Sequence, residues 1–170
     1  MCLNTLDHTL GETYSLLHGK NWRSRKFEEM KEPGLIYILL KEKSDSKDEI
    51  LAGFLSMKFV DEDGLWVVYL YEIQIEEGYR NCGIGSQLLD IYSSIPDSLN
   101  ENGSYTNRFG PVDGTALTVF SSNEGAFRFY KAHGYKLDRN SPRDRKLRDG
   151  KIRKPAYYIM IKYSAAGSIR

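Results

Sequence analysis

The chain has 170 residues, of which 41% are hydrophobic and 12% aromatic, which is enough to bury one core of domain size. Its 24 Lys and Arg nearly balance its 23 Asp and Glu, so the net charge of +1 gives no overall attraction to nucleic acid or to a membrane surface. We therefore expect a single domain over residues 1–170, and any charged partner must be inferred from local clusters.

Cysteine usage and apolar run length exclude further classes of protein. Cys2 and Cys82 make neither a metal-ligand spacing nor a disulfide framework. No apolar stretch reaches the roughly 18 to 20 residues that span a bilayer, and the polar N-terminal residues lack the apolar segment of a signal peptide. These features predict a soluble protein of a reducing intracellular compartment.

The spacing of apolar residues predicts the elements of the first half of the chain. Spacings of three and four residues indicate helix, and short runs rich in β-branched and aromatic residues indicate strands. In chain order the predictions are one or two helices over 5–31 within an N-terminal helical segment 1–31, a strand over 35–40, a charged turn over 44–49, a strand over 50–60, a tight hairpin turn over 61–64 and a long central strand over 66–75.

Gly, Pro and Asn mark the element boundaries of the second half. The Asn123 side chain can cap a helix, and Gly134 can end it in the left-handed conformation. In chain order the predictions are a helix over 83–95 stopped by Pro96, an exposed loop over 97–114, a strand over 115–120, a helix over 123–133, a short strand over 135–137, a charged loop over 140–154 and a closing strand over 155–163. This order predicts an α/β or α+β fold with helices on both faces of a sheet.

Residues 80–86 form a glycine loop between the predicted central strand and a helix. Gly83 and Gly85 let bare backbone approach an anion, and the N–H groups of such a loop and of the helix N-terminus favour a pyrophosphate. The loop lacks the third glycine of a dinucleotide fold and the Gly-Lys-Ser or Gly-Lys-Thr of a nucleotide-hydrolysing loop. Taken alone, a Gly-X-Gly sequence before a helix is equally compatible with a plain turn.

Two segments together resemble one acetyltransferase family. The segments are Arg80-Asn81-Cys82-Gly83-Ile84-Gly85 and, further on, Leu117-Thr118-Val119-Phe120 with Asn123, Ala126, Phe129-Tyr130 and Gly134-Tyr135. Their order and spacing are similar to the paired motifs of the GCN5-related N-acetyltransferases, the GNAT family, over roughly residues 65–137. Within that family, residues 69–75, 117–120 and 140–142 resemble the NatD-type histone N-terminal acetyltransferases.

The resemblance implies a mixed, mostly antiparallel sheet that is splayed where acetyl-CoA binds as co-substrate, and no metal ion. It implies cofactor contacts from the backbone of the central strand, from the glycine loop and from one helix start, at Gln74, Ile75, Glu76, Cys82, Gly83, Ile84, Gly85, Ser86, Gln87 and Asn123. It also implies a monomer without an auxiliary subunit, located in the cytoplasm and nucleus.

Glu72 is the candidate general base for acetyl transfer. Direct transfer needs a neutral amine, and strand alternation places Glu72 on the same face as the apolar Val68 and Leu70. Burial raises the pKa of a carboxylate toward the range of a proton acceptor at neutral pH. The alternative is a glutamate paired with a Lys or Arg of a neighbouring strand. Tyr130 stands where relatives keep a tyrosine that protonates the CoA thiolate, but helix packing explains it equally well.

The resemblance implies that the substrate is the terminal serine amine of histones four and two-A, whose tails begin Ser-Gly-Arg-Gly. An acidic receptor for the substrate arginine is expected at Asp61 and Asp63, although an ordinary acidic turn would have the same sequence. The other substrate-binding candidates are Tyr14, Tyr71, Thr118, Ser141 and Tyr157.

Two other functions fit the same fold. One is acetylation of lysine side chains or small amines, and the other is a non-catalytic acyl-CoA-binding module. The basic stretch 143–154 is interrupted by Asp144 and Asp149, which favours a solvated loop, so direct nucleic-acid binding is not expected.

Overall fold

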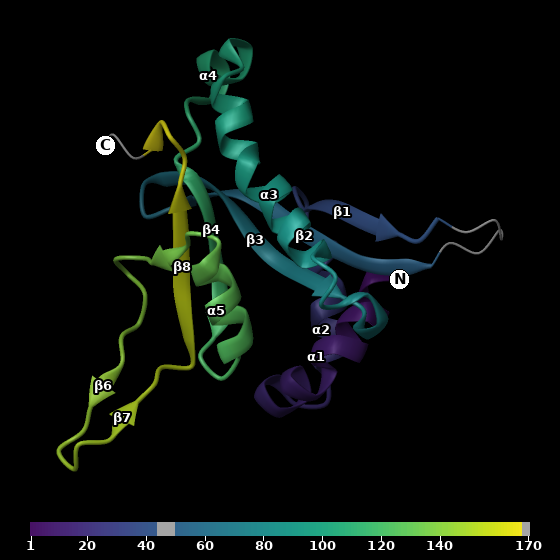
Figure 1. The fold of residues 1–170 in the computed structure, drawn as a ribbon, viewed down its shortest axis with the longest axis vertical. Helices are drawn as coiled ribbons and strands as arrows, with labels where there is room; N and C mark the ends of the chain where they lie inside the picture. The colour runs from purple at the N-terminus through teal and green to yellow at the C-terminus, as the bar shows by residue number, and fades with distance from the viewer. Residues whose placement is uncertain (44–49, 168–170) are drawn as a thin grey trace. The chain divides into compact units, whose positions relative to one another are not determined.

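The computed structural model describes residues 1–43 and 50–167 as five α-helices, one short 3-10 helix and eight strands (Figure 1). The helices are α1 Cys2–His18, α2 Trp22–Glu29, η1 Glu77–Tyr79, α3 Ile84–Asn100, α4 Gly103–Phe109 and α5 Glu124–Ala132. The strands are β1 Ile36–Lys41, β2 Leu51–Glu62, β3 Leu65–Ile75, β4 Gly114–Phe120, β5 Lys136–Leu137, β6 Arg145–Lys146, β7 Ile152–Arg153 and β8 Tyr157–Tyr163. The charged turn predicted over 44–49 lies outside the described residues.

Six strands form one sheet in the order β1-β2-β3-β4-β8-β5, and β6 and β7 form a separate pair. The β3–β4 pair is parallel, from Val67 opposite Gly114 to Leu70 opposite Leu117, whereas β1–β2, β4–β8 and β5–β8 are antiparallel. The predicted fold class, a mixed and mostly antiparallel sheet with helices, is confirmed.

The chain divides into two compact units, which are described separately below. The first unit contains Met1–Lys58 and Tyr71–Leu88, and the second contains Phe59–Leu70 and Leu89–Arg170. Strands β2 and β3 and helix α3 each contribute residues to both units, since the unit boundaries fall inside these elements.

The first unit buries apolar side chains of α1, α2 and β2. Leu6, Phe54 and Leu55 are fully buried, and Trp22 is 5% exposed. At Gly53 of β2, an added Cβ would lie 2.6 Å from the carbonyl oxygen of Gln74, so only glycine permits β2 and β3 to approach this closely. This approach fixes the end of β3, which carries the candidate base.

The core of the second unit lies around Val67 of β3, Ala116 of β4 and Ile161 of β8, all at most 4% exposed. The buried Tyr92 hydroxyl of α3 lies 2.6 Å from the carbonyl oxygen of Val68 and 3.0 Å from that of Ala116. These contacts fix the part of α3 in this unit to two neighbouring strands.

The prediction that Pro96 stops the third helix is wrong, because α3 continues through Pro96 to Asn100. A proline inside a helix removes one backbone hydrogen bond and usually breaks the helix. Here tertiary contacts hold the last turn: the Asn100 amide bonds both the N–H and the carbonyl of Val112, and Asp97 accepts from the N–H of Ala165 at 2.9 Å.

The exposed loop predicted over 97–114 is also partly wrong, because it contains the end of α3 and all of α4. Asn102 caps α4, since its side chain accepts from the N–H groups of Ser104 and Tyr105, and Gly110 follows the helix with a φ of 78°. Short polar residues signal caps as well as loops, so this composition does not separate the two.

The other predicted elements agree with the structure apart from small boundary shifts. The turn after β2 consists of Asp63 and Gly64, both with positive φ as a two-residue hairpin of type I′ requires. Asn123 caps α5, and Gly134 ends it in the left-handed region. The charged loop over 140–154 contains the unpredicted hairpin β6–β7, which Figure 1 shows extending away from β8.

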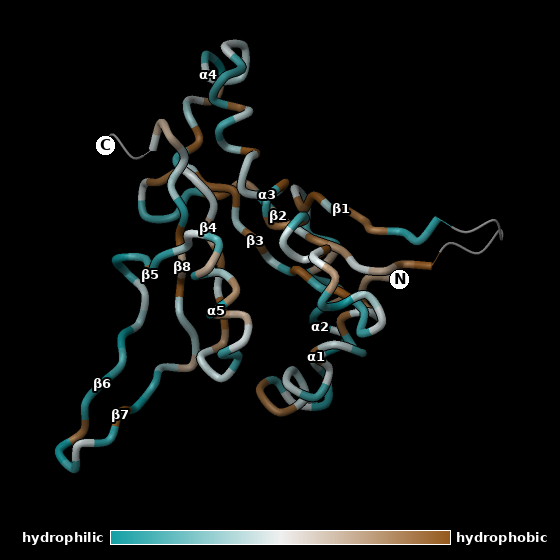
Figure 2. Tube along the Cα trace, viewed as in Figure 1, coloured by the Kyte–Doolittle hydropathy of each residue, from teal (hydrophilic) through white to brown (hydrophobic). Residues whose placement is uncertain are grey.

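Helix length and polarity bear on membrane insertion. Across the described residues, each helix is too short or too polar to cross a bilayer. The hydropathy-coloured trace in Figure 2 shows hydrophilic stretches along both α1 and α3.

Candidate functional site

Glu72 of β3 lies in a buried polar cluster of the first unit. It is 6% exposed, and the alternation of β3 buries it together with Leu70 and Gln74, as predicted. Both carboxylate oxygens have partners: Oε1 accepts from the Tyr14 hydroxyl at 2.9 Å, and Oε2 accepts from Nε2 of Gln74 at 2.9 Å. The charge is therefore buried but fully hydrogen-bonded.

Lys26 of α2 forms a buried ion pair with Glu72, which the sequence analysis did not find. Its Nζ lies 2.6 Å from Oε1 of Glu72 and 2.5 Å from Oε1 of Glu29, and the Lys26 side chain is 7% exposed. Burial is the largest single influence on Lys26 and lowers its pKa, but the charge of Glu72, the nearby Tyr14 and the hydrogen bonds to Glu29 and Glu72 together outweigh burial, so the net pKa is raised. The cation that pairs with Glu72 therefore comes from a helix and not from a neighbouring strand.

Tyr14 and Thr9 of α1 complete this cluster. Burial, followed by the charge of Glu72, raises the pKa of the Tyr14 phenol, so the hydroxyl keeps its proton and donates a hydrogen bond to the carboxylate. The Thr9 hydroxyl lies 2.7 Å from Oε1 of Gln74, whose amide nitrogen in turn bonds Glu72. Two of the predicted site residues, Tyr14 and Glu72, are thus in direct contact.

Trp22 of α2 packs beside this cluster. Its ring lies 5.1 Å from the ring of Tyr14, and it is nearly fully buried. Trp22 and Lys26 are four residues apart on α2 and therefore share one face of the helix. This spacing is the signal by which sequence reasoning could have placed Lys26 inside.

The glycine loop lies between β3 and α3, as predicted, and the unpredicted 3-10 helix η1 lies between β3 and the loop. Asn81 and Gly83 both have positive φ, 62° and 84°, and residues 81–83 are exposed. The first N–H groups of α3, beginning with those of Ile84 and Gly85, have no carbonyl partner inside the helix. An added Cβ at Gly83 would have no other atom within 4 Å, so the space in front of the loop is open.

This loop fits a pyrophosphate group such as that of acetyl-CoA. Exposed backbone N–H groups at the start of a 17-residue helix, preceded by a left-handed turn, form a positive concavity. Ser86 and Gln87 follow in the first turn of α3. Cys82 is exposed and its thiol lies 2.9 Å from the carbonyl oxygen of Tyr79.

The end of β3 is in contact with β2. The N–H of Glu76 donates to the carbonyl of Ala52 at 2.9 Å, and the Gln74 carbonyl lies close to Gly53. Ile75 is half-buried, and its side chain lies near the same glycine. A cofactor contact to the Glu76 N–H would therefore have to share that group with β2.

In the second unit, the acidic hairpin turn is held by its own side chains. Oδ1 of Asp61 accepts from the N–H of Gly64 at 2.8 Å, and Oδ2 of Asp63 accepts from the Asn140 amide. Arg139 also donates to the Asp63 carbonyl at 3.2 Å. The turn thus binds residues 139–140, which the sequence did not indicate.

Glu62 lies among other carboxylates in this region. Its pKa is raised, first by partial burial and then by the negative charges of Asp63, Asp138 and Asp61. Asp138 is only 6% exposed, and its Oδ1 accepts from the N–H of Asn140 at 2.7 Å. Four carboxylates therefore concentrate negative charge at one place on this unit.

The remaining substrate candidates lie on or beside β3, β4 and β8. The Thr118 hydroxyl lies 2.6 Å from that of Tyr69, and Tyr157 is 41% exposed opposite Phe120. The Ser141 hydroxyl is buried and accepts from the N–H of Ile159 at 3.0 Å, which anchors the loop after β5. Tyr71 is half-buried and lies on the opposite face of β3 from Glu72.

Two candidates lie on α5. Asn123 uses its side-chain oxygen to accept from the N–H of Ala126 at 3.1 Å, so its amide nitrogen remains the group that could reach a ligand. Tyr130 is 7% exposed, with its ring 6.0 Å from that of Tyr135 and 5.5 Å from that of Phe129. These contacts agree with helix packing for Tyr130.

The second unit also has a hollow of about 570 Å³ beside α5, lined in part by Phe127, Arg143, Lys154 and Tyr158. None of the predicted site residues lines it. Across the described residues, there is no group of three or more His, Cys, Asp and Glu side chains that could hold a metal ion.

Comparison with known proteins adds sequence evidence. A family model described as an acetyltransferase (GNAT) domain matches residues 33–137. N-alpha-acetyltransferase 40 from Saccharomyces cerevisiae is 31% identical to this chain over 158 residues, covering 83% of this chain and 52% of its own length. The chain thus spans about half the length of this curated relative.

Solved structures share the fold. Arabidopsis thaliana NAA60 in complex with a bisubstrate analogue has a TM-score of 0.58 at 17% identity, over 96% of this chain and 94% of its own. The ribosomal-protein-S18-alanine N-acetyltransferase from Escherichia coli has a TM-score of 0.51 at 22% identity, over 91% of this chain and 86% of its own. At these identities the similarity shows a common fold.

Proposed function

We propose that this chain, which belongs to the GNAT acetyltransferase family, transfers an acetyl group from acetyl-CoA to the α-amine of a protein N-terminus. The likeness to N-alpha-acetyltransferase 40 supports this choice of amine. The structural observation that carries the proposal is the buried Glu72 on β3, two residues before Gln74 and close in sequence to the glycine loop. A base and an anion cradle on consecutive elements are what acetyl transfer requires.

The glycine loop is the proposed site for the pyrophosphate of acetyl-CoA, which supplies an acetyl group activated as a thioester. The N–H groups of residues 82–87 bind the phosphates, and the Asn123 amide provides a further contact. Gln74, Ile75 and Glu76 are proposed to lie along the pantetheine arm.

This cofactor site is tested by calorimetry with acetyl-CoA. Gly83→Asp places a carboxylate in the cradle, and it should weaken binding at least tenfold. Gly78→Asp is the matched control, because Gly78 is equally open and lies outside the cradle. If both variants and the unchanged protein bind acetyl-CoA with equal affinity, the loop is not part of the cofactor site.

Glu72 is proposed to accept the proton of the substrate ammonium. In the structure, the Lys26 ammonium occupies its Oε1, and the same Nζ also bonds Glu29. A substrate ammonium can replace Lys26 at Oε1 while Lys26 keeps Glu29 as its partner. Tyr14 and Gln74 then hold the carboxylate in place while it takes the proton, and the neutral amine attacks the acetyl carbonyl.

The proposed substrate is the terminal serine of a Ser-Gly-Arg-Gly tail, as in histones four and two-A. A substrate arginine suits the carboxylates of the second unit, where like charges already raise the pKa of Glu62. Asp61 and Asp63 are proposed to contribute through their charge, although each also has a partner within the turn. Tyr71, Thr118, Ser141 and Tyr157 remain proposed peptide contacts.

The acidic receptor is tested by measuring the rate at which the CoA thiol is released with each of two peptides, Ser-Gly-Arg-Gly and Ser-Gly-Gln-Gly. The unchanged protein should prefer the arginine peptide at least tenfold in kcat/KM, and Glu62→Gln should reduce that preference. Glu42→Gln, an exposed carboxylate of the first unit, should keep the preference. If the unchanged protein does not prefer the arginine peptide, the proposed acidic receptor is wrong. The proposal of acetyl transfer itself is not affected by that result.

A further inference from the structure

The segment over residues 139–154, here called the basic arm, concentrates positive charge. It carries eight Lys and Arg against two Asp, which leaves 16 Lys and Arg against 21 Asp and Glu in the rest of the chain. All eight cationic side chains are exposed. The near-zero net charge of the chain therefore conceals a strongly basic segment on an otherwise acidic protein.

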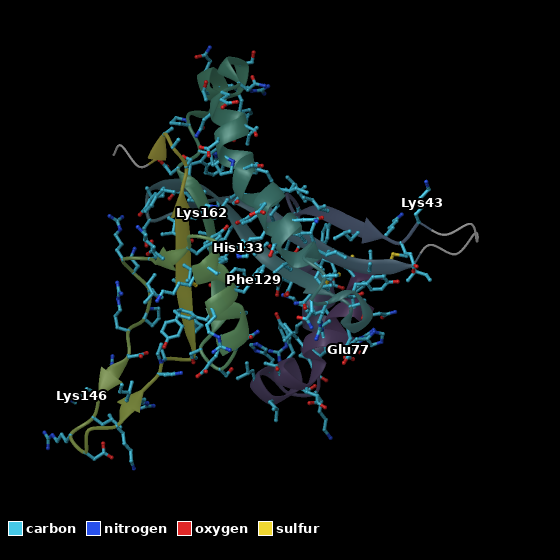
Figure 3. All side chains as sticks on the ribbon, viewed as in Figure 1. Lys43, Glu77, Phe129, His133, Lys146 and Lys162 are labelled. Carbon is cyan, nitrogen blue, oxygen red and sulfur yellow. The ribbon has the colours of Figure 1, made fainter. Side chains whose placement is uncertain are left out.

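The arm has a defined shape. Strands β6 and β7 form a two-stranded antiparallel hairpin of their own, which Figure 1 shows projecting away from β8 and α5 within the second unit. Figure 2 shows that the arm is mostly hydrophilic, and Figure 3 shows Lys146 on the β6 side of the arm. The charge is thus presented on a narrow ribbon.

Arg145 and Arg153 lie directly opposite each other in the hairpin. Like charges at directly opposite positions destabilise a strand pair, and a lone two-stranded hairpin is marginal in water even without them. Between the described residues, no ion pair involves Arg145 or Arg153 and offsets this repulsion. A bound polyanion would remove it.

Most cations near the hairpin are not neutralised by the protein. Lys154 bonds Glu124 at 2.7 Å, and Lys151 lies 3.5 Å from Asp149. Between described residues, there is no ion pair that involves Arg145, Lys146, Arg148 or Arg153. These four side chains are available to a partner.

The shape of the arm favours one kind of polyanion. The major groove of B-form DNA admits a two-stranded β-ribbon, whereas the major groove of A-form RNA is too narrow for side chains to read. Leu147 and Ile152, 42% and 65% exposed, lie on the same ribbon and suit apolar base edges in the groove. An anionic membrane is less favoured, because the rest of the chain has more Asp and Glu than Lys and Arg.

We propose that the basic arm is a docking element for duplex DNA, which binds phosphates through Arg145, Lys146, Arg148 and Arg153 with the β6–β7 ribbon in the major groove. This interaction departs from the expectation of a solvated loop without a nucleic-acid partner, and it does not depend on acetyl transfer. It is electrostatic and largely independent of base sequence. It would hold the enzyme near any substrate that is itself associated with DNA.

The test is fluorescence anisotropy of the full chain with a labelled DNA duplex of about 20 base pairs at several salt concentrations. We expect a Kd on the order of 1–100 µM near physiological salt, with log K falling against log salt at a slope of about −4, which corresponds to four or five phosphate contacts. Arg145→Glu/Arg153→Glu should weaken binding more than tenfold and reduce the slope by about two.

Lys131→Glu/Lys136→Glu is the matched control, because it makes the same charge change at exposed sites of the second unit outside the arm. It should weaken binding less than threefold. Arg145→Gln/Arg153→Gln should give an intermediate loss, and peptide acetylation and the melting temperature show whether each variant is folded.

Three outcomes would overturn the proposal. They are no binding to duplex DNA, equal losses from the arm and control variants, and tighter binding to duplex RNA or to phosphatidylserine vesicles than to DNA. None of these outcomes bears on acetyl transfer, which is measured separately with a free peptide.

Discussion

The Nζ atom of Lys26 lies 2.6 Å from Oε1 of Glu72, and both side chains are less than 8% exposed. This buried ion pair joins α2 to β3. Desolvating two charges is costly, and their attraction offsets that cost only while both partners are present. The candidate base is therefore tied to the stability of the N-terminal helices.

Lys26→Met should destabilise the protein by about 3 kcal/mol, because it leaves the Glu72 charge buried without its cation. Lys31→Met is the control, since Lys31 pairs with Glu28 on the surface, where both side chains are more than half exposed, and such pairs contribute at most about 1 kcal/mol. Urea unfolding measures both. Equal effects would mean that the buried pair contributes no more than a surface pair.

Glu72→Gln should lower kcat for peptide acetylation by about 10²–10⁴-fold, the usual contribution of a general base, while acetyl-CoA affinity changes little. The amide keeps the shape of the side chain and can still accept from Tyr14. Glu28→Gln, an exposed carboxylate, should keep full activity. If Glu72→Gln retains kcat, the proton is accepted elsewhere, and if the unchanged protein shows no turnover, it is a binding module.

Local patterns predicted most elements of this fold because local chemistry determines them. The Asp-Gly turn after β2, the Asn123 cap and the Gly134 helix end each depend on residues within one turn. The alternation of β3 likewise predicted that Glu72 is buried. These features need no knowledge of distant residues.

Features decided by distant contacts were missed. Lys26 is a charged residue on a helix, and its contact with Glu72 in the first unit, which explains its burial, is not visible in the local sequence. Pro96 would stop an isolated helix, but Asn100 and Asp97 hold the following turn through Val112 and Ala165. The sequence analysis did include an ion pair with Lys or Arg as an alternative for Glu72. It placed that partner on a neighbouring strand, whereas the structure places it on a helix.

Gly114→Ala should destabilise the second unit strongly. A Cβ at this position would lie 2.3 Å from the carbonyl oxygen of Lys162 and 2.8 Å from the Cα of Tyr163, so the β4–β8 backbone would have to shift. Overpacking of this kind typically costs about 1–3 kcal/mol. Gly103→Ala in α4, where an added Cβ meets nothing within 4 Å, should be neutral or slightly stabilising in the same thermal unfolding experiment.

Tyr158 should make the stability depend on alkaline pH. Burial, followed by its hydrogen bond to Asp144, raises the pKa of this phenol to about 12 from its ordinary value near 10. Because the folded-state pKa is raised, the stabilisation is full below pH ~10 and is lost as pH rises toward ~12. The slope of unfolding free energy against pH over this window should be smaller in Tyr158→Phe. An unchanged slope would show that Tyr158 does not contribute to it.

The central claim is acetyl transfer to a terminal amine, and mass spectrometry of one peptide tests it most directly. The peptide begins Ser-Gly-Arg-Gly and carries an internal lysine, and it is incubated with the full chain and acetyl-CoA. We predict a single acetyl group on the terminal serine amine, and no product when that amine is blocked. An acetyl group found only on the lysine side chain, or no acetylation of either amine, would contradict the account.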